Sequence, residues 1–398
     1  MSSESIYAGV LLKADEVQLV FGQTVNGGVV ALRNPVPRFR SYQEGRFDRR
    51  HPITRQNREA VLRAIGQHIA SVPGSVRRIG CGSYGPVHSV SLEDRDALLF
   101  ENVDRQEALE RHLNYGRVRE TSTHQALKGL RVYHTLREGL ERSRIEVIVH
   151  TDVTCGALAE AYGRSIRRPG VRLHGPHDVL VFLHIAEGVG GAYVVGTEPG
   201  RSALHPEMGY QSGLVVGGDR WGERLAAERK STNKAVFIED LLSIDALLQR
   251  WKDDQGKSVG DRELSLDGLP KKYWKTVPDY IAQLCASAVV MLAPHQIVLH
   301  GPVVHSAPPR LLKDVRAGLR NWLDVRGIGP IVSYREMLDD RYAFIDIPLD
   351  LGLEPDEAGV PKHEPMLKGA LLLAAQADYK RRPDSDAEIK EFSPRSRP

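Results

Sequence analysis

The sequence predicts an α/β protein of two lobes, and three observations support this prediction. The chain has 398 residues, more than one hydrophobic core usually accommodates. Apolar strand-like segments are followed by helical segments, and this succession occurs twice along the chain. Hydrophobic residues make up 41% and charged residues 26%, which is ordinary for a globular protein.

The first half of the chain alternates between the two kinds of element. Short apolar segments predict strands at residues 6–12, 16–22, 27–33, 76–82 and 144–150. Val61, Ile65 and Ile69 recur at helical spacing and predict a helix over 53–72. The small residues of 154–165 predict another helix, one that can pack closely.

The second half repeats this order. A glycine turn joins two predicted antiparallel strands, 178–188 and 191–196. Apolar patterns then predict a helix, a strand and two more helices, at residues 277–294, 296–301, 310–327 and 366–382.

This order of elements predicts the domain organisation. We expect a small N-terminal lobe over 1–138, closed by the helix 366–382, and a large lobe over 139–365. The charged, Pro- and Ser-rich residues 383–398 predict a disordered tail. Ligands of α/β folds bind where loops leave the carboxyl ends of strands. Four segments occupy such positions, namely Gly80–Pro86, His150–Cys155, Ala186–Gly191 and Gly301–Pro302.

The charge balance excludes some function classes. Fifty-four Lys and Arg residues oppose 51 Asp and Glu residues, so no basic field predicts binding to nucleic acid or to a membrane. No signal peptide and no apolar run of the roughly 20 residues that span a bilayer are visible, which predicts a cytoplasmic protein. Cys81, Cys155 and Cys285 lie too far apart for a zinc knuckle or a disulfide framework.

Asp152 is the first candidate for chemistry. It lies in VHTDVTCGALAE, just after an apolar strand and just before a helix. One interpretation is an N-cap, because an Asp there bonds free backbone N–H groups. The other is a carboxylate at the edge of a cleft that accepts a proton from an attacking substrate hydroxyl. The segment alone favours neither.

Two glycine-rich segments and one polar loop are further candidates. RIGCGSYGPV (78–87) and AEGVGGAY (186–193) predict either tight turns or backbone N–H groups offered to hydroxyls and phosphates. In ALHPEMGYQSG (203–213), His205 and Glu207 are groups that can hold vicinal hydroxyls, although a His-Pro loop also occurs without function.

Together these segments resemble the ROK family of sugar kinases and repressors, and within it the fructokinase-like branch. The resemblance is carried by the order of IGCGSYGP, YGRVRETSTHQALKG, HTDVTCGALAE, AEGVGGAY, HPEMGY and APHQIVLHGPV. It implies a ribonuclease-H-like fold of the actin/hexokinase class, with the ligand in a cleft between the lobes. It also implies ATP with magnesium as the phosphoryl donor, and often a homodimer.

The same resemblance implies roles for individual residues. Asp152 falls on the catalytic aspartate, while His205 and Glu207 fall on the residues that hold sugar hydroxyls. The further residues assigned to the substrate are Gly82, Ser83, Tyr84, Thr151 and Tyr210. The residues assigned to the nucleotide are Gly188, Gly190, Gly191 and Gly301.

The chain departs from the family on the nucleotide side. Side chains and carboxylates replace the glycines, threonines and other residues that approach phosphate, at Leu11, Lys13–Ala14, Asp15–Glu16, Glu187 and His300–Gly301–Pro302. Extra negative charge opposes polyphosphate there. The structural zinc site of the branch is absent as well, because no cysteine occurs between Cys155 and Cys285, and we predict no metal site.

Three hypotheses therefore stay open. The first is an ATP-dependent kinase of a sugar or sugar-like hydroxyl. The second is a repurposed enzyme for another group transfer or glycosyl reaction in specialised metabolism, in which Lys13, Arg38 and Arg40 are either receptors for a different anionic donor or solvated surface. The third is a non-catalytic sugar-binding pseudokinase. A DNA-binding repressor is not expected, because the first strand begins by residue 6.

Overall fold

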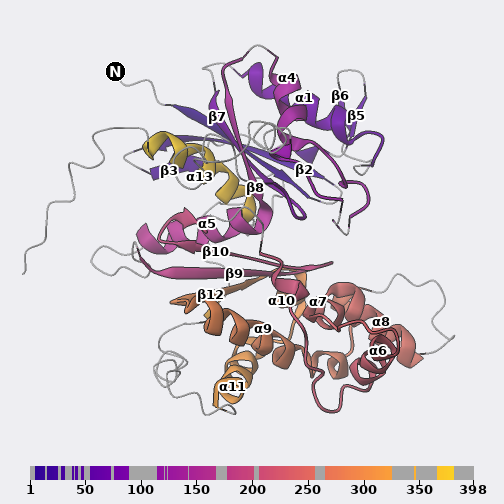
Figure 1. Cartoon of the computed structure of the whole chain (residues 1–398). Helices are drawn as coiled ribbons and strands as arrows, with labels where there is room; N and C mark the ends of the chain where they lie inside the picture. Colours follow the sequence, from indigo (N-terminus) through magenta and orange to yellow (C-terminus); the bar gives the residue numbers. More distant parts are fainter. Residues whose placement is uncertain are drawn as a thin grey trace, which may run out of the picture.

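The computed structural model describes most of the chain. The described residues are 5–13, 16–25, 28–31, 38–39, 41–43, 46–48, 54–72, 76–88, 114–120, 122, 124–141, 143–166, 177–200, 206–255, 265–324, 345–346 and 365–380. They form two large β-sheets, each with its own hydrophobic core, and two helices lie between these sheets (Figure 1). The predicted α/β class is confirmed.

The first sheet is mixed and has the strand order β3-β2-β1-β7-β8, with β4 also paired to β2. Its strands are β1 (Ile6–Leu12), β2 (Val17–Val25), β3 (Gly28–Ala31), β4 (Arg38–Phe39), β7 (Val76–Ser83) and β8 (Glu146–Thr151). β1 and β2 are antiparallel, whereas β1, β7 and β8 are parallel. Helices α1 (Arg58–Ala70) and α4 (Val132–Leu140) pack on this sheet, and β5 (Ser41–Gln43) forms a separate hairpin with β6 (Arg46–Asp48).

The second sheet has the order β11-β10-β9-β12-β13. Its strands are β9 (Val179–Ile185), β10 (Val189–Val195), β11 (Glu198–Pro199), β12 (Gln296–His300) and β13 (Ile345–Asp346). β9 runs antiparallel to β10 and parallel to β12, so the carboxyl ends of β9 and β12 meet at one edge. Five of the described helices lie on the side of this sheet that is away from the first sheet (Figure 1), namely α7 (Ile238–Leu242), α8 (Ile244–Gln255), α9 (Val277–Leu292), α10 (Pro302–Ser306) and α11 (Leu311–Asp324).

Helices α5 (Asp152–Ile166) and α13 (Pro365–Lys380) fill the space between the sheets (Figure 1). Small residues make this close packing possible. A side chain at Gly80 would collide with the backbone of α13, and one at Gly369 would collide with the backbone of Cys155 in α5. Gly156 faces the ring of Phe182 in the second sheet in the same way. The predicted close packing of the 154–165 helix is therefore present.

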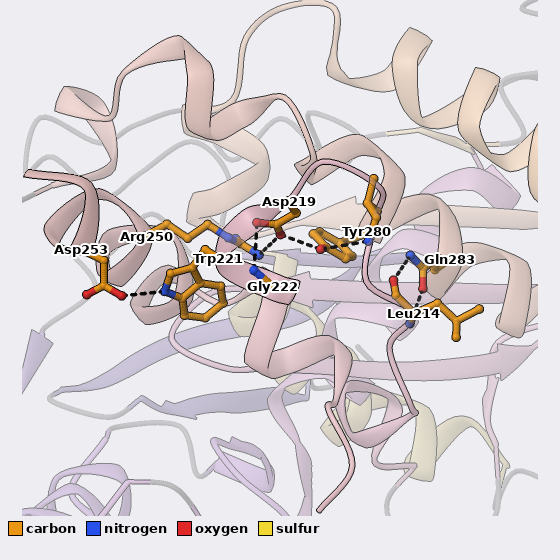
Figure 2. Close-up of polar contacts among 9 residues, drawn as sticks. Leu214, Asp219, Trp221, Gly222, Arg250, Asp253, Tyr280 and Gln283 are labelled. Atoms are coloured by element: carbon orange, nitrogen blue, oxygen red, sulfur yellow. Dashed lines mark hydrogen bonds and ion pairs between the residues drawn. The ribbon is translucent and has the colours of Figure 1, made fainter. Parts of the chain in front are cut away.

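A buried polar cluster fixes the chain between η1 (Met208–Tyr210) and α7, a segment that contains α6 (Arg220–Ser231). Asp219 accepts hydrogen bonds from Tyr280 Oη (2.6 Å) and from the N–H of Gly222 (3.1 Å), and it pairs with Arg250 Nη2 (3.0 Å) (Figure 2). The guanidinium of Arg250 lies over the ring of Trp221, 4.7 Å from its centroid. The short helices η3 (Leu266–Gly268) and η4 (Lys271–Trp274) complete this part of the chain.

Most predicted elements are present with shifted ends. The helix predicted over 154–165 begins at Asp152, and the strand predicted over 27–33 ends at Ala31. Helices α4, α6, α7 and α8 were not predicted. The tail 383–398 lies outside the described residues, and the lobe boundary between residues 138 and 139 stays a prediction.

Candidate active site

A cavity of about 530 Å³ lies where the loops after β7 and β9 meet the beginning of α5. This volume is typical of pockets for small molecules. Its wall is formed by Tyr84, Gly85, Pro86, Arg119, Asp152, Val153, His184, Ala186, Gly188, Val189, Gly190, Glu207, Tyr210 and Glu239. The fold thus brings together six residues that the sequence singled out, which are Tyr84, Asp152, Gly188, Gly190, Glu207 and Tyr210.

Asp152 is the first residue of α5, and its side chain is 8% exposed in the cavity wall. Its Oδ1 accepts a hydrogen bond from the N–H of Val153 (2.8 Å). The hydroxyl of Thr151 accepts from the N–H of Thr154 (3.3 Å), which is the bond that an N-cap residue makes. Thr151 therefore caps the helix, and it is 1% exposed.

Two other residues assigned to the substrate side lie behind the wall. Gly82 is buried in β7, where a side chain would come within 3.0 Å of Cys155 Sγ and 3.4 Å of Asp152 Cα. Ser83 is fully buried, and its hydroxyl donates to the carbonyl of Tyr84 (3.3 Å). The missing side chain of Gly82 lets α5 approach β7 closely, which brings Asp152 to the cavity. His205 lies outside the described residues.

The turn between β9 and β10 provides the glycines of the cavity. The N–H of Val189 donates to Glu239 Oε2 (2.8 Å), and the N–H of Ala186 donates to the carbonyl of Gly188 (2.8 Å). A Cβ added at Gly188 would lie 2.8 Å from Glu239 Oε2, so the glycine leaves room for this carboxylate beside the turn. Gly191 instead packs against Met208, and the segment is a hairpin turn as well as a cavity wall.

Gly301 follows β12 and is not a lining residue. Its φ of 109° lies in a region that favours glycine, and a side chain would collide with the backbone of Ile185. Pro302 begins α10 directly after it and has no N–H to offer a phosphate.

Glu207 and Glu239 face the same cavity from the two ends of the 211–238 segment. Residues of that segment pair with each other beside them, since the N–H of Ile238 donates to Gln211 (3.0 Å) and that of Gly213 to Val236 (2.9 Å). Burial raises the pKa of both carboxyls above the ordinary value of 4.5. Each carboxylate can accept two hydroxyl donors, so the pair suits a ligand with neighbouring hydroxyls.

Tyr210 lies at the edge of this group. Its ring is 42% exposed and packs edge to face on Phe237, with 5.4 Å between the centroids. Burial and the nearby carboxylates of Glu239 and Glu207 raise the pKa of its hydroxyl. Tyr210 thus offers a neutral aromatic face with a hydroxyl beside the two carboxylates.

A histidine cluster lies at the carboxyl ends of β9 and β12. His184 lines the cavity, and its Nδ1 lies 2.9 Å from Nδ1 of His300, the residue opposite it in the sheet. His305 packs edge to face on His300. Burial, together with the charges of Lys13 and His305, lowers the pKa of His184 to about 3. His184 is therefore neutral at physiological pH, and one of the two close nitrogens carries the shared hydrogen.

Three lining residues were missed by the sequence analysis. Arg119 lies within the 115–129 segment that was noted, yet nothing marked that residue. His184 lies in an apolar strand and had no signal of its own. Glu239 is 32 positions after Glu207, and only the folded segment between them brings the two together.

The residues around the hairpin turn do not fit a polyphosphate held by backbone N–H groups. The N–H groups of Ala186 and Val189 are already bonded, and the imidazoles of His184 and His300 occupy the edge where the strands meet. Glu187 is exposed and is not a lining residue. Leu11 is a core residue packed with α13.

The residues that the structure describes contain no group of three or more His, Cys, Asp and Glu side chains that could hold a metal ion. No helix among them is long and apolar enough to cross a membrane.

The two sheets around a central helix pair, with a cavity at the strand ends, define an α/β protein of the actin/hexokinase-like class, as predicted. The sequence model of the ROK family matches residues 42–335, and the chain belongs to that family. The predicted resemblance is therefore confirmed.

Individual relatives are distant. The chain is 27% identical to a Bacillus subtilis (strain 168) protein named "Putative fructokinase". The alignment extends over 304 residues, which are 76% of this chain and 80% of that protein. The structure of a ROK hexokinase from Thermus thermophilus matches with a TM-score of 0.55 at 17% identity, over 94% of this chain and 99% of that one. A glucokinase from Balamuthia mandrillaris in complex with glucose matches with a TM-score of 0.56 at 13% identity, over 94% of each chain.

Proposed function

We propose that the chain is a sugar-kinase-like transferase that binds a sugar or sugar-like substrate in the cavity and activates one of its hydroxyls through Asp152. The observation that carries this proposal is the convergence of Asp152, Glu207 and Glu239 on one cavity. Names of the relatives support it, since the Bacillus protein is named as a fructokinase and the glucokinase structure contains glucose.

Each carboxylate has a distinct role in this proposal. Glu207 and Glu239 accept hydrogen bonds from neighbouring substrate hydroxyls and so fix the ring. Asp152, held by the N–H of Val153, takes the proton of the attacking hydroxyl late, as charge develops on its oxygen. The exposed ring of Tyr210 and the ring of Tyr84 form apolar walls against which the sugar packs.

A second candidate function is a group transfer from a donor other than ATP. The bonded N–H groups of the hairpin turn and the stacked imidazoles of His184 and His300 favour it. Lys13 lies close enough to lower the pKa of His184, so a positive charge is present on this side. The side chains of Arg38 and Arg40 lie outside the described residues.

The first experiment is calorimetric titration with a panel of hexoses and with Mg-ATP. The expected result of the titration is that the wild type binds hexose. In a separate turnover assay, we expect Asp152→Asn to lower transferase turnover by about 10²–10⁴-fold. Heat with Mg-ATP selects the kinase, whereas heat with hexose alone selects another donor. An Asp152→Asn variant that retains full turnover would refute the role of Asp152, and a wild type that binds hexose without turning it over with any donor would be a pseudokinase.

Two further parts of the proposal are the location of the protein and its oligomeric state. The near balance of charged residues agrees with a cytoplasmic enzyme. Sedimentation of the purified protein would test the homodimer that the family resemblance implies.

A further inference from the structure

Arg119 is held rigidly at its backbone. Its N–H donates to the carbonyl of Pro86 (2.9 Å), and the N–H of Val118 donates to Leu130 (2.9 Å). Val118 also forms a β-bridge with Val87, at the end of the loop that carries Tyr84. The side chain of Arg119 thus enters the cavity from a fixed position.

The guanidinium of Arg119 has no partner among the residues that the structure describes. Its Nε is buried without a hydrogen bond, and the side chain makes no ion pair with them. The other described arginines with a buried, unbonded nitrogen each bond through another nitrogen, to carbonyls for Arg58 and Arg316, and to carboxylates for Arg78, Arg164 and Arg250. Arg119 therefore differs from every arginine of this group.

The charge of Arg119 acts on its neighbours without being neutralised by contact. It lowers the pKa of Glu207, against the larger opposite effect of burial, although the two side chains form no ion pair. The pKa of His88 is lowered as well, mainly by burial and then by the charges of Arg119 and Arg117. A positive field therefore extends over this wall of the cavity.

A second polar group beside Arg119 also lacks a partner. The N–H of Ser122 donates to the carbonyl of Arg119 (3.1 Å), which closes a turn. The hydroxyl of Ser122 is buried and has no hydrogen bond within the described part of the chain. It lies next to Gly85 of the cavity wall, where an added Cβ would be 2.8 Å from Ser122 Oγ. Leaving buried donors unbonded costs free energy, which a ligand can recover.

We propose that the hydroxylated substrate carries an oxyanion, a carboxylate or a phosphate ester, and that Arg119 binds this group. The inference rests on the proposed function and names the class of its substrate, a sugar acid or a sugar phosphate. A guanidinium is planar and always charged, and it matches two oxygens of such a group with two parallel N–H donors. Two other groups that line the same cavity, the carboxylates of Glu207 and Glu239, then hold the hydroxyl part of the same molecule.

The test is calorimetric titration of the full chain with matched probes. Glucose, glucuronate and glucose 6-phosphate share one ring, and fructose with fructose 6-phosphate forms a second set. We expect one anionic probe to bind about tenfold or more tightly than its neutral parent, an advantage that falls as salt is raised. The probe that gains affinity shows whether the natural group is a carboxylate or a phosphate ester.

The variants are Arg119→Gln, Arg119→Lys and the control Arg117→Gln. Arg117 is two residues away and pairs with Glu120 (3.0 Å) outside the cavity. Arg119→Gln should abolish the preference for the anion while neutral sugars bind as before, and Arg119→Lys should keep part of it. Arg117→Gln should keep all of it. Circular dichroism confirms that each variant is folded.

The outcomes separate this inference from the proposed function. If neutral sugars bind the wild type and no anionic probe binds more tightly, the inference is refuted and the proposed function stands. The same holds if Arg119→Gln weakens neutral and anionic probes equally, because Arg119 is then an ordinary wall residue. If no probe of either kind binds, both proposals are refuted.

Discussion

Arg119 and Arg250 carry the same charge into two different surroundings. Arg250 is buried, pairs with Asp219 at 3.0 Å and lies against the rings of Trp221 and Tyr280. Arg119 projects into the cavity and has no side-chain partner in the described residues. A buried polar group that is bonded within the protein holds the chain in place, whereas one without a partner is ready for a ligand.

The Asp219 cluster holds the segment on which the two cavity glutamates depend. Gln283 exchanges two hydrogen bonds with the backbone of Leu214, at 2.9 and 2.7 Å (Figure 2). The hydroxyl of Tyr280 accepts from the N–H of Val216 (3.3 Å). These bonds tie the 211–238 segment to α9, and Glu207 and Glu239 flank this segment along the chain.

The largest expected effect breaks the closed cluster. Asp219→Ala removes the carboxylate that Arg250, Tyr280 and Gly222 share, and it leaves a buried cation without its counter-charge. We expect a loss of stability of about 3–5 kcal/mol. Chemical and thermal unfolding measure it. The control is Glu138→Ala, which removes an exposed ion pair with Arg63 and should cost at most about 1 kcal/mol. Equal losses in the two variants would contradict a structural role for the cluster.

A smaller effect is expected at the open side. Glu207→Gln replaces a charged acceptor of substrate hydroxyls with a neutral one. We expect hexose affinity to fall by about tenfold, because a hydrogen bond to a charged group contributes about 1.5–3 kcal/mol. The unfolding temperature should not fall at pH 7, since the carboxylate has no structural ion pair in the described residues and burial disfavours its charged form. A stability loss like that of Asp219→Ala would place Glu207 with the structural group.

The smallest effect concerns pH. Burial raises the pKa of Glu239 above 4.5, more than the N–H of Val189 lowers it, so the folded chain holds this proton more tightly than the unfolded chain. Stability therefore falls as pH rises through the interval between the two pKa values and remains lower above it. Glu239→Gln keeps an oxygen for Val189. It should raise the unfolding temperature at pH 7 by roughly 1 °C, with the gain vanishing below pH 4.5. A gain that persists at pH 4 would contradict this origin.

The sequence predicted the strands more successfully than the polar helices. β1, β9 and β12 are nearly continuous apolar runs because both of their faces are buried, and such runs are visible without a structure. Helix α6 exposes most of its surface, and only Gly222 in it is buried, so it has no apolar stripe to detect.

The candidate site was predictable in part for a related reason. Asp152 and Glu207 lie in short motifs that resemble the ROK pattern, so their neighbours along the chain mark them. Arg119, His184 and Glu239 become members of the cavity only through contacts between distant segments. Resemblance also assigned Gly82, Ser83 and Thr151 to the substrate, whereas these residues lie behind the cavity wall. Gly82 packs closely against α5, and Thr151 caps this helix. A sequence motif does not distinguish residues needed for such packing from residues that contact a ligand.

The place of α13 between the sheets has a consequence for biosynthesis. β1 leaves the ribosome long before α13 does, yet Gly9 and Gly80 of the first sheet pack against the backbone of Leu371 and Ala370 in α13. The apolar face formed by Tyr7, Leu11 and Val20 is therefore covered only after α13 has been synthesised. Until then this face is exposed to aggregation, and the nascent chain is a natural client for chaperones.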